Sequence, residues 1–166
     1  MNIRRVIRHV LYTDWQARNA FPPGTLQAIG LAIHASEKMH GGEVRFAVEG
    51  GLDGILSCRG HSARERAIAV FSELRVWDTE RNNGVLIYVL LADRAVEIVA
   101  DRGIHVRVGD DGWRDICQQM ESAFSQSKYQ DGAIHGIGLV AAAIGRHFPA
   151  LQKRVNELPD QPVMLT

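Results

Sequence analysis

The sequence predicts an α/β fold in which a small mixed β-sheet lies sandwiched between α-helices. Residues 43–49 alternate strictly between polar and apolar side chains, which is typical of a strand with one buried face. Residues 84–91 are apolar on both faces, as in a central strand covered by helices on each side. A helical pattern over 62–76 separates the two strands and predicts a parallel crossover unit. A third strand over 96–100 follows a tight turn, so the last two strands form an antiparallel hairpin.

The N-terminal segment predicts an amphipathic helix. Its apolar face is formed by Val6, Ile7, Val10 and Leu11, and its arginines 4, 5 and 8 lie away from that face. We expect the apolar face to dock on the core. The alternative is contact of this basic helix with an anionic membrane surface.

The remaining helices have recognisable start signals. A helix begins at Pro22-Pro23 and runs to the Gly41-Gly42 stop, and Ser62 with Glu65 forms a capping box for the helix over 62–76. Asp110 or Asp111 is expected to cap the helix with the clearest amphipathic stripe, and Asp131 is expected to cap the last helix. The glycines of the last helix, at positions 136, 138 and 145, indicate close packing against a neighbour.

Length and composition indicate one globular domain. We divide the 166 residues into an N-terminal helical arm at 1–22, an α/β domain at 23–148 and an extended tail at 149–166. Nineteen basic residues balance nineteen acidic ones, which argues against a nucleic-acid partner. No apolar run approaches the ~20 residues of a transmembrane helix, and no export signal is visible, so we expect a cytoplasmic protein.

The predicted topology collects polar residues at one edge of the sheet. The first two strands start at this edge and the third ends there, because parallel strands start together and a hairpin returns to its origin. The residues expected at this edge are His40, Glu43, Asp78, Glu80, Asn82, Asn83, Asp101, Arg102, His105, Asp110 and Asp111. Loops rich in oxygen ligands suit calcium, whereas helix caps and solvated charges are the alternative explanation.

Part of this edge carries a family resemblance. Asn82-Asn83-Gly84 leads into an apolar strand, and Gly103-Ile104 with an aspartate at 110 precedes an amphipathic helix. With Tyr129-Gln130-Asp131-Gly132 before the last helix, residues 25–147 resemble the TPM domain. The tail over 156–160 is similar to that of a short, soluble bacterial subgroup. Relatives include membrane-tethered bacterial proteins and a thylakoid-lumen acid phosphatase of photosystem repair.

The resemblance implies a mixed-sheet α/β sandwich and a divalent cation, calcium in particular, held by acidic loop residues. We therefore expect Asn83, Asp101 and Asp110 as metal ligands. The chain departs from the family pattern: Asn82 replaces a common aspartate, Asp101 a common glycine and His105 a frequent acidic residue.

Two functions are expected from this resemblance. The preferred one is a non-catalytic, divalent-cation-binding accessory module that works with a membrane-associated protein in membrane-protein maintenance. The alternative is a metal-dependent acid phosphatase acting on phosphomonoesters, with His105 as acid or base and Arg102 as charge clamp, which needs both residues in one pocket with Asp101 and Asp110. The neutral net charge and the apolar arm are compatible with a homodimer.

Overall fold

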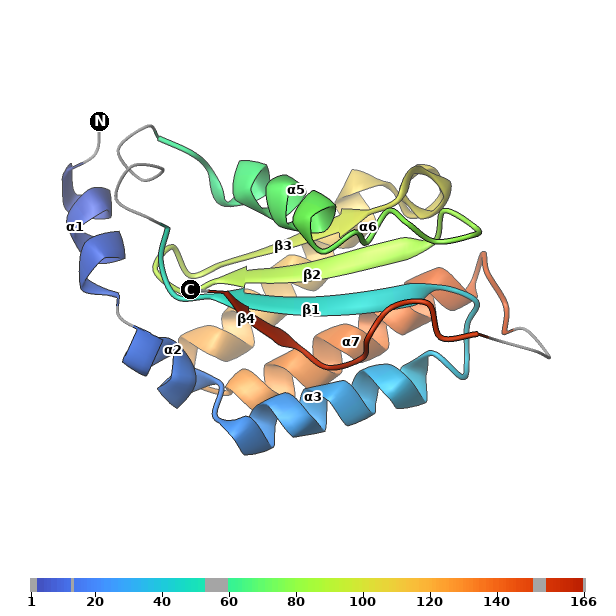
Figure 1. The fold of residues 1–166 in the computed structure, drawn as a ribbon, viewed down its shortest axis with the longest axis horizontal. Coiled ribbons are helices and arrows are strands. Elements are labelled where there is room, and N and C mark those ends of the chain that lie inside the picture. Colours follow the sequence, from blue (N-terminus) through green and yellow to red (C-terminus); the bar gives the residue numbers. More distant parts are fainter. Residues whose placement is uncertain (1–2, 13, 53–59, 151–154, 166) are drawn as a thin grey trace.

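The sheet has four strands, in the order β3 (Ala95–Ala100), β2 (Gly84–Leu90), β1 (Glu43–Glu49) and β4 (Val163–Leu165) (Figure 1). This computed structural model describes residues 3–12, 14–52, 60–150 and 155–165. β1 runs parallel to β2 and to β4, and β3 runs antiparallel to β2. The predicted crossover unit and hairpin are therefore confirmed, as is the α/β class.

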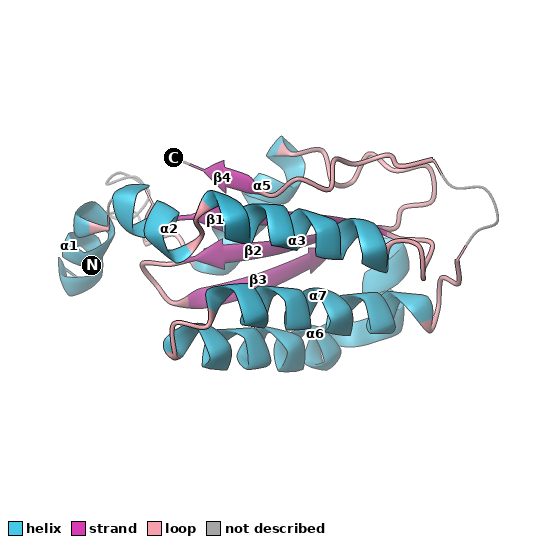
Figure 2. Cartoon of the chain, turned by 90° about the horizontal axis from the view of Figure 1, so that it is seen from below, coloured by secondary structure: helices cyan, strands magenta, loops and turns pink. Residues whose placement is uncertain are grey.

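Helices cover both faces of the sheet. On one face lie α3 (Pro23–Ser36), α6 (Arg102–Ser125) and α7 (Tyr129–Gly145), and on the other lies α5 (Ala63–Glu73) (Figures 1 and 2). Residues of β2 alternate between the two cores this creates: Ile87 belongs to the three-helix side, and Leu86 and Tyr88 belong to the α5 side. The apolar character of both faces of this strand is thereby explained.

β1 is buried along its whole length, which differs from the single buried face that its alternation predicted. Its polar side chains are buried with partners. Arg45 donates to the carbonyls of Pro159 and Gln161, and Glu49 accepts from Arg66 and Tyr88. Alternation does not reveal this burial, because a polar side chain can occupy a covered face when its hydrogen bonds are satisfied.

The C-terminal residues lie along this polar face. The Leu158 N–H donates to Glu43 Oε2 over 3.1 Å, and β4 then pairs with the end of β1. His34 of α3 contacts Asp160 over 2.8 Å. The tail thus supplies an edge strand, which the sequence did not indicate.

Two helix starts differ from expectation. α6 begins at Arg102, with Asp101 as its N-cap, and is broken at Gly109, whose φ of 77° lies in the left-handed region. Asp110 therefore follows the break and begins the second helical segment, which carries the amphipathic stripe, but it is not the N-cap of α6. α7 begins after Lys128, so Asp131 lies in the first turn, where its charge can interact with the helix dipole.

The expected close packing of the last helix is confirmed at Gly136. A Cβ added there would lie 2.3 Å from Sδ of Met120 in α6, whereas one added at Gly138 would meet nothing within 4 Å. Small residues therefore bring α6 and α7 together on one side of α7 only.

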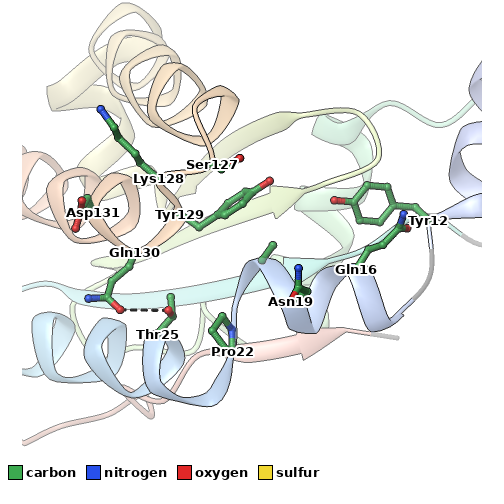
Figure 3. A pocket seen from close by; sticks show the side chains of 11 residues that line it. Tyr12, Gln16, Asn19, Pro22, Thr25, Ser127, Lys128, Tyr129, Gln130 and Asp131 are labelled. Atoms are coloured by element: carbon green, nitrogen blue, oxygen red, sulfur yellow. Dashed lines mark hydrogen bonds between the residues drawn. The ribbon is translucent and has the colours of Figure 1, made fainter.

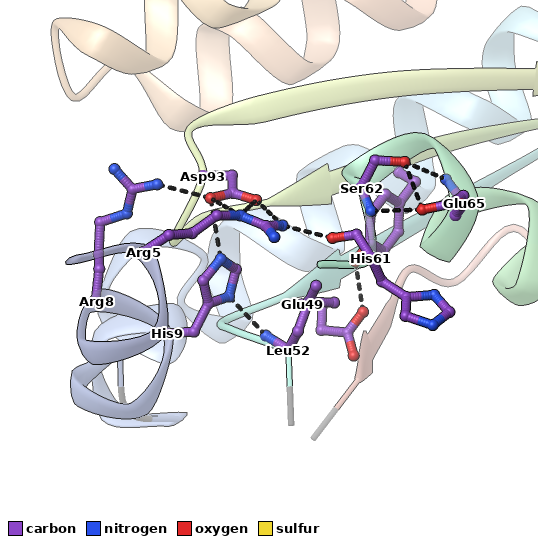
Figure 4. Close-up of polar contacts among 10 residues, drawn as sticks. Arg5, Arg8, His9, Glu49, Leu52, His61, Ser62, Glu65 and Asp93 are labelled. Atoms are coloured by element: carbon purple, nitrogen blue, oxygen red, sulfur yellow. Dashed lines mark hydrogen bonds and ion pairs between the residues drawn. The ribbon is translucent and has the colours of Figure 1, made fainter. Parts of the chain in front are cut away.

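The N-terminal helix α1 (Ile3–Leu11) docks through its polar face, so the expectation of apolar docking is wrong. Arg5, Arg8 and His9 all contact the carboxylate of Asp93, in the turn between β2 and β3, at 2.6, 2.7 and 2.9 Å (Figure 4). His9 is buried, and its Nδ1 accepts from the Leu52 N–H, so Nε2 carries the proton donated to Asp93. The three contacts to the Asp93 carboxylate therefore decide which face of α1 packs on the protein, and the apolar face does not. A second helix, α2 (Asp14–Ala20), connects α1 to α3.

We expect Asp93→Asn to release α1 and to lower the free energy of unfolding by about 1–2 kcal/mol at pH 7. Burial alone would raise the pKa of Asp93, but hydrogen bonds from Arg5, His9 and Arg8 outweigh it and hold this pKa at about 2. Because the folded-state pKa is depressed, the stabilisation is complete above the ordinary value of 3.8 and is lost as the pH falls toward 2.

Urea unfolding at pH 7, 4 and 2.5 measures this effect. Between pH 4 and pH 2.5 the variant should lose less unfolding free energy than the natural chain, because it has no carboxylate to protonate at position 93. Asp111→Asn, at a side chain that is 95% exposed, is the control and should change stability by less than about 0.5 kcal/mol. An unchanged pH dependence in Asp93→Asn would contradict the assignment.

Candidate cation site at the strand-start edge

Asn83 and Asp101 lie on neighbouring strands at the edge where β1 and β2 begin. The Asp101 N–H donates to the Gly84 carbonyl over 2.8 Å, and the Glu43 N–H donates to the Asn83 carbonyl over 3.1 Å. These two bonds extend the sheet by one residue beyond β2 and β3. The topology predicted this meeting of strand ends, and the structure confirms it.

The side chain of Asn83 is 2% exposed and has one unused oxygen. Its Nδ2 donates to the Gly41 carbonyl, which fixes the orientation of the amide because a carbonyl can only accept. Oδ1 is buried and has no hydrogen-bond partner. A buried acceptor without a donor is costly in a native protein, and its usual partners are an ordered water or a bound cation.

Asp101 presents a second such oxygen. Its Oδ1 accepts from the Arg102 N–H over 2.9 Å, as the N-cap of α6, while its Oδ2 is buried without a partner. One carboxylate therefore serves the helix with one oxygen and leaves the other unused. Carboxylate and amide oxygens are ligands that calcium and magnesium accept.

Close backbone approach at this edge requires glycine at two positions. A Cβ on Gly84 would lie 2.0 Å from the Val76 carbonyl oxygen, and one on Gly103 would lie 2.8 Å from the Asn82 carbonyl oxygen. Gly84 and Gly103 thus let neighbouring backbone segments approach the strand ends closely.

The other predicted site residues lie farther along α6. His105 Nε2 is 3.5 Å from Asp110 Oδ1, across the break at Gly109, and the Asp110 side chain is 74% exposed. Arg102 is exposed at the helix start. In the part of the chain that the structure describes, no three His, Cys, Asp or Glu side chains form a group that could hold a metal.

Asp110 lines a different pocket from the strand-start edge. That pocket, of about 330 Å³, is also lined by Arg64, Glu97 and Trp113, and Asp101, Arg102 and His105 are not among its lining residues. The structure therefore places Asn83 and Asp101 at the strand-start edge, where the Asp101 N–H bonds the Gly84 carbonyl, and it brings His105 and Asp110 into contact elsewhere on α6.

A larger pocket lies at the other end of the sheet, where the sequence predicted no site. It has a volume of about 650 Å³, and Tyr12, Thr25, Lys128 and Tyr129 line it together with Gln130 (Figure 3). Thr25 Oγ1 donates to Gln130 Oε1 over 3.2 Å. Its lining residues come from two segments, 12–25 and 127–131, that are more than 100 positions apart in the sequence, so only the fold could reveal that they meet.

Comparison with known proteins identifies the family of this chain. The sequence model of the TPM domain matches residues 16–143. The chain belongs to the TPM domain family. No curated protein matches it.

Two solved structures resemble this TPM protein. One is the NMR structure of the BA42 protein from the psychrophilic bacterium Bizionia argentinensis, with a TM-score of 0.75 and 30% identity over 86% of this chain and 93% of that one. The other is the N-terminal domain of a protein from P. gingivalis, with a TM-score of 0.61 and 16% identity over 80% and 82% of the two chains, which shows the shared fold alone. No helix in the described ranges is both long and apolar enough to cross a membrane.

Proposed function

We propose that this TPM protein is an accessory module that binds a divalent cation, calcium in particular, at the strand-start edge. The observation that carries the proposal is that two buried oxygens at this edge, Asn83 Oδ1 and Asp101 Oδ2, have no hydrogen-bond donor among the described residues. A cation is one partner that such oxygens accept. The expected membrane-associated protein partner stays a prediction.

In this proposal Asn83 and Asp101 hold the ion, and waters complete its coordination. The bond from Asn83 Nδ2 to the Gly41 carbonyl orients the amide, and capping by Asp101 Oδ1 anchors the carboxylate to α6. The bound ion would then couple the starts of β1 and β2 to the start of α6. Only one carboxylate contributes, so we expect weak affinity, with a Kd on the order of 0.1–1 mM.

Isothermal titration of the metal-stripped chain with calcium and magnesium tests the site. Asp101→Asn keeps the capping oxygen of the side chain but removes its charge, and it should weaken calcium binding at least tenfold. Asp110→Asn is the matched control, because its side chain is exposed and lies in the other pair. Heat at the level of dilution, or equal loss in both variants, would contradict the assignment to Asn83 and Asp101.

The alternative function is hydrolysis of phosphomonoesters, and the contact between His105 and Asp110 favours it. An imidazole beside a carboxylate can exchange a proton with a leaving group, and the exposed Arg102 could neutralise a phosphate. Turnover of a model phosphate ester that His105→Gln abolishes would establish this function. Calcium binding without turnover supports the non-catalytic module.

A further inference from the structure

The helix α1 turns an apolar face away from the protein. Ile7, Val10 and Leu11, which share one side of the helix, and Trp15 at the start of α2 are between 51% and 71% exposed. Isolated exposed apolar residues are ordinary, but these follow one another at helical spacing. The cause is the docking of α1 on Asp93, which commits its polar face to the protein interior.

This apolar face lies at one end of the molecule. In both views α1 projects beyond the end of the sheet, with α2 between it and α3 (Figures 1 and 2). A flat surface could therefore approach α1 and α2 without meeting the sheet or α5.

The charge around this face is positive. The first 20 residues of the sequence contain four arginines and one aspartate. Arg8 contacts Asp93 but keeps a side chain that is 52% exposed, and Arg18 is exposed on α2. Exposed aliphatic residues, a tryptophan and flanking arginines are the composition of helices that lie in the interface of anionic membranes.

We propose that α1 and α2 bind the surface of an anionic lipid bilayer, with Ile7, Val10, Leu11 and Trp15 inserted at headgroup depth and the arginines facing acidic headgroups. A second copy of the chain fits this face less well, because pairing two copies across it would bring their arginines together. The proposal is independent of the cation site, which lies at the opposite end of β1 and β2.

Co-sedimentation of the full chain with vesicles tests the proposal. Vesicles of phosphatidylcholine and phosphatidylglycerol at 3:1 should bind the protein in the presence of EDTA, and binding should weaken as salt rises. Pure phosphatidylcholine vesicles should bind at least tenfold less. Trp15 emission should shift to the blue on binding, and Trp15→Phe should remove that shift.

Matched variants distinguish binding through this face from non-specific binding through other exposed apolar residues. Val10→Ser with Leu11→Ser should reduce binding at least tenfold. Leu31→Ser with Met39→Ser, at residues 64% and 68% exposed elsewhere, should change it less than twofold. Asp101→Asn should bind vesicles normally, so failure of the cation site would be distinguishable.

Three results would overturn the proposal. They are absence of binding to the acidic vesicles, equal binding to neutral ones, and a dimer in gel filtration that Val10→Ser with Leu11→Ser dissociates. The last would assign the face to self-association. Circular dichroism of each variant confirms that it is folded.

Discussion

Replacing Gly84 by alanine is expected to lower the free energy of unfolding by about 3 kcal/mol. The new Cβ would lie 2.0 Å from the Val76 carbonyl oxygen and 3.0 Å from its carbon, both backbone atoms. Neither side can move freely. The Val76 N–H bonds the Phe71 carbonyl, and the Gly84 carbonyl accepts from Asp101. Relief therefore requires distortion of the start of β2 or of the loop after α5.

Gly138→Ala is the control for this prediction. Its Cβ would meet nothing within 4 Å, and it lies inside α7, where alanine favours the helix, so stability should be unchanged or rise by up to about 1 kcal/mol. Denaturant unfolding of both variants gives the comparison. A loss below about 1 kcal/mol in Gly84→Ala would show that the approach of Val76 is not a tight constraint.

Glu49→Ala is expected to lower the free energy of unfolding by a similar amount, about 3 kcal/mol. Glu49 is buried and accepts from Tyr88 Oη over 2.5 Å and from Arg66 Nε over 2.9 Å. Burial and the neighbouring carboxylate raise the pKa of Tyr88, so its hydroxyl stays a donor. Removing Glu49 leaves the buried phenol without its acceptor and the mostly buried guanidinium with Glu73 as its remaining carboxylate.

Glu73→Ala removes the second, solvent-exposed carboxylate that contacts Arg66. Glu73 contacts Arg66 Nη1 over 2.8 Å but is 54% exposed, so its loss should cost less than about 1 kcal/mol. Thermal or urea unfolding of the two variants ranks the contacts. Equal losses would mean that burial of Glu49 adds nothing to the strength of its ion pair.

The sheet was predictable from the sequence where periodicity reflects burial directly. The strand at 84–91 is apolar on both faces because both faces are covered, and the capping box of Ser62 and Glu65 forms as expected. Periodicity failed where polar groups are satisfied inside the protein. The arginine in β1 and those of α1 looked like solvent-facing residues, yet Arg45 and Arg5 are held by carbonyls or by Asp93.

Other elements could not be predicted because they are too short to show a pattern or pair with a segment far away in the sequence. β4 has three residues, fewer than a strand pattern needs, and its partner β1 is more than 100 positions away. At the site, topology predicted that Asn83 and Asp101 share an edge. It could not separate them from His105 and Asp110, because the sequence did not indicate the helical segment that begins at Arg102 and runs to the break at Gly109.

The most direct test of the central claim is a calcium titration of the ¹⁵N-labelled chain followed by two-dimensional NMR. A cation held by Asn83 and Asp101 predicts saturable shifts of the Asn83 side-chain amide, of the Arg102 N–H, which donates to Asp101, and of the Gly42 N–H, which shares a peptide group with the Gly41 carbonyl that Asn83 bonds. Signals around Asp93, at the other end of the sheet, should stay in place. Shifts confined to Asp93 or Asp110, or no shifts at millimolar calcium, would contradict the site.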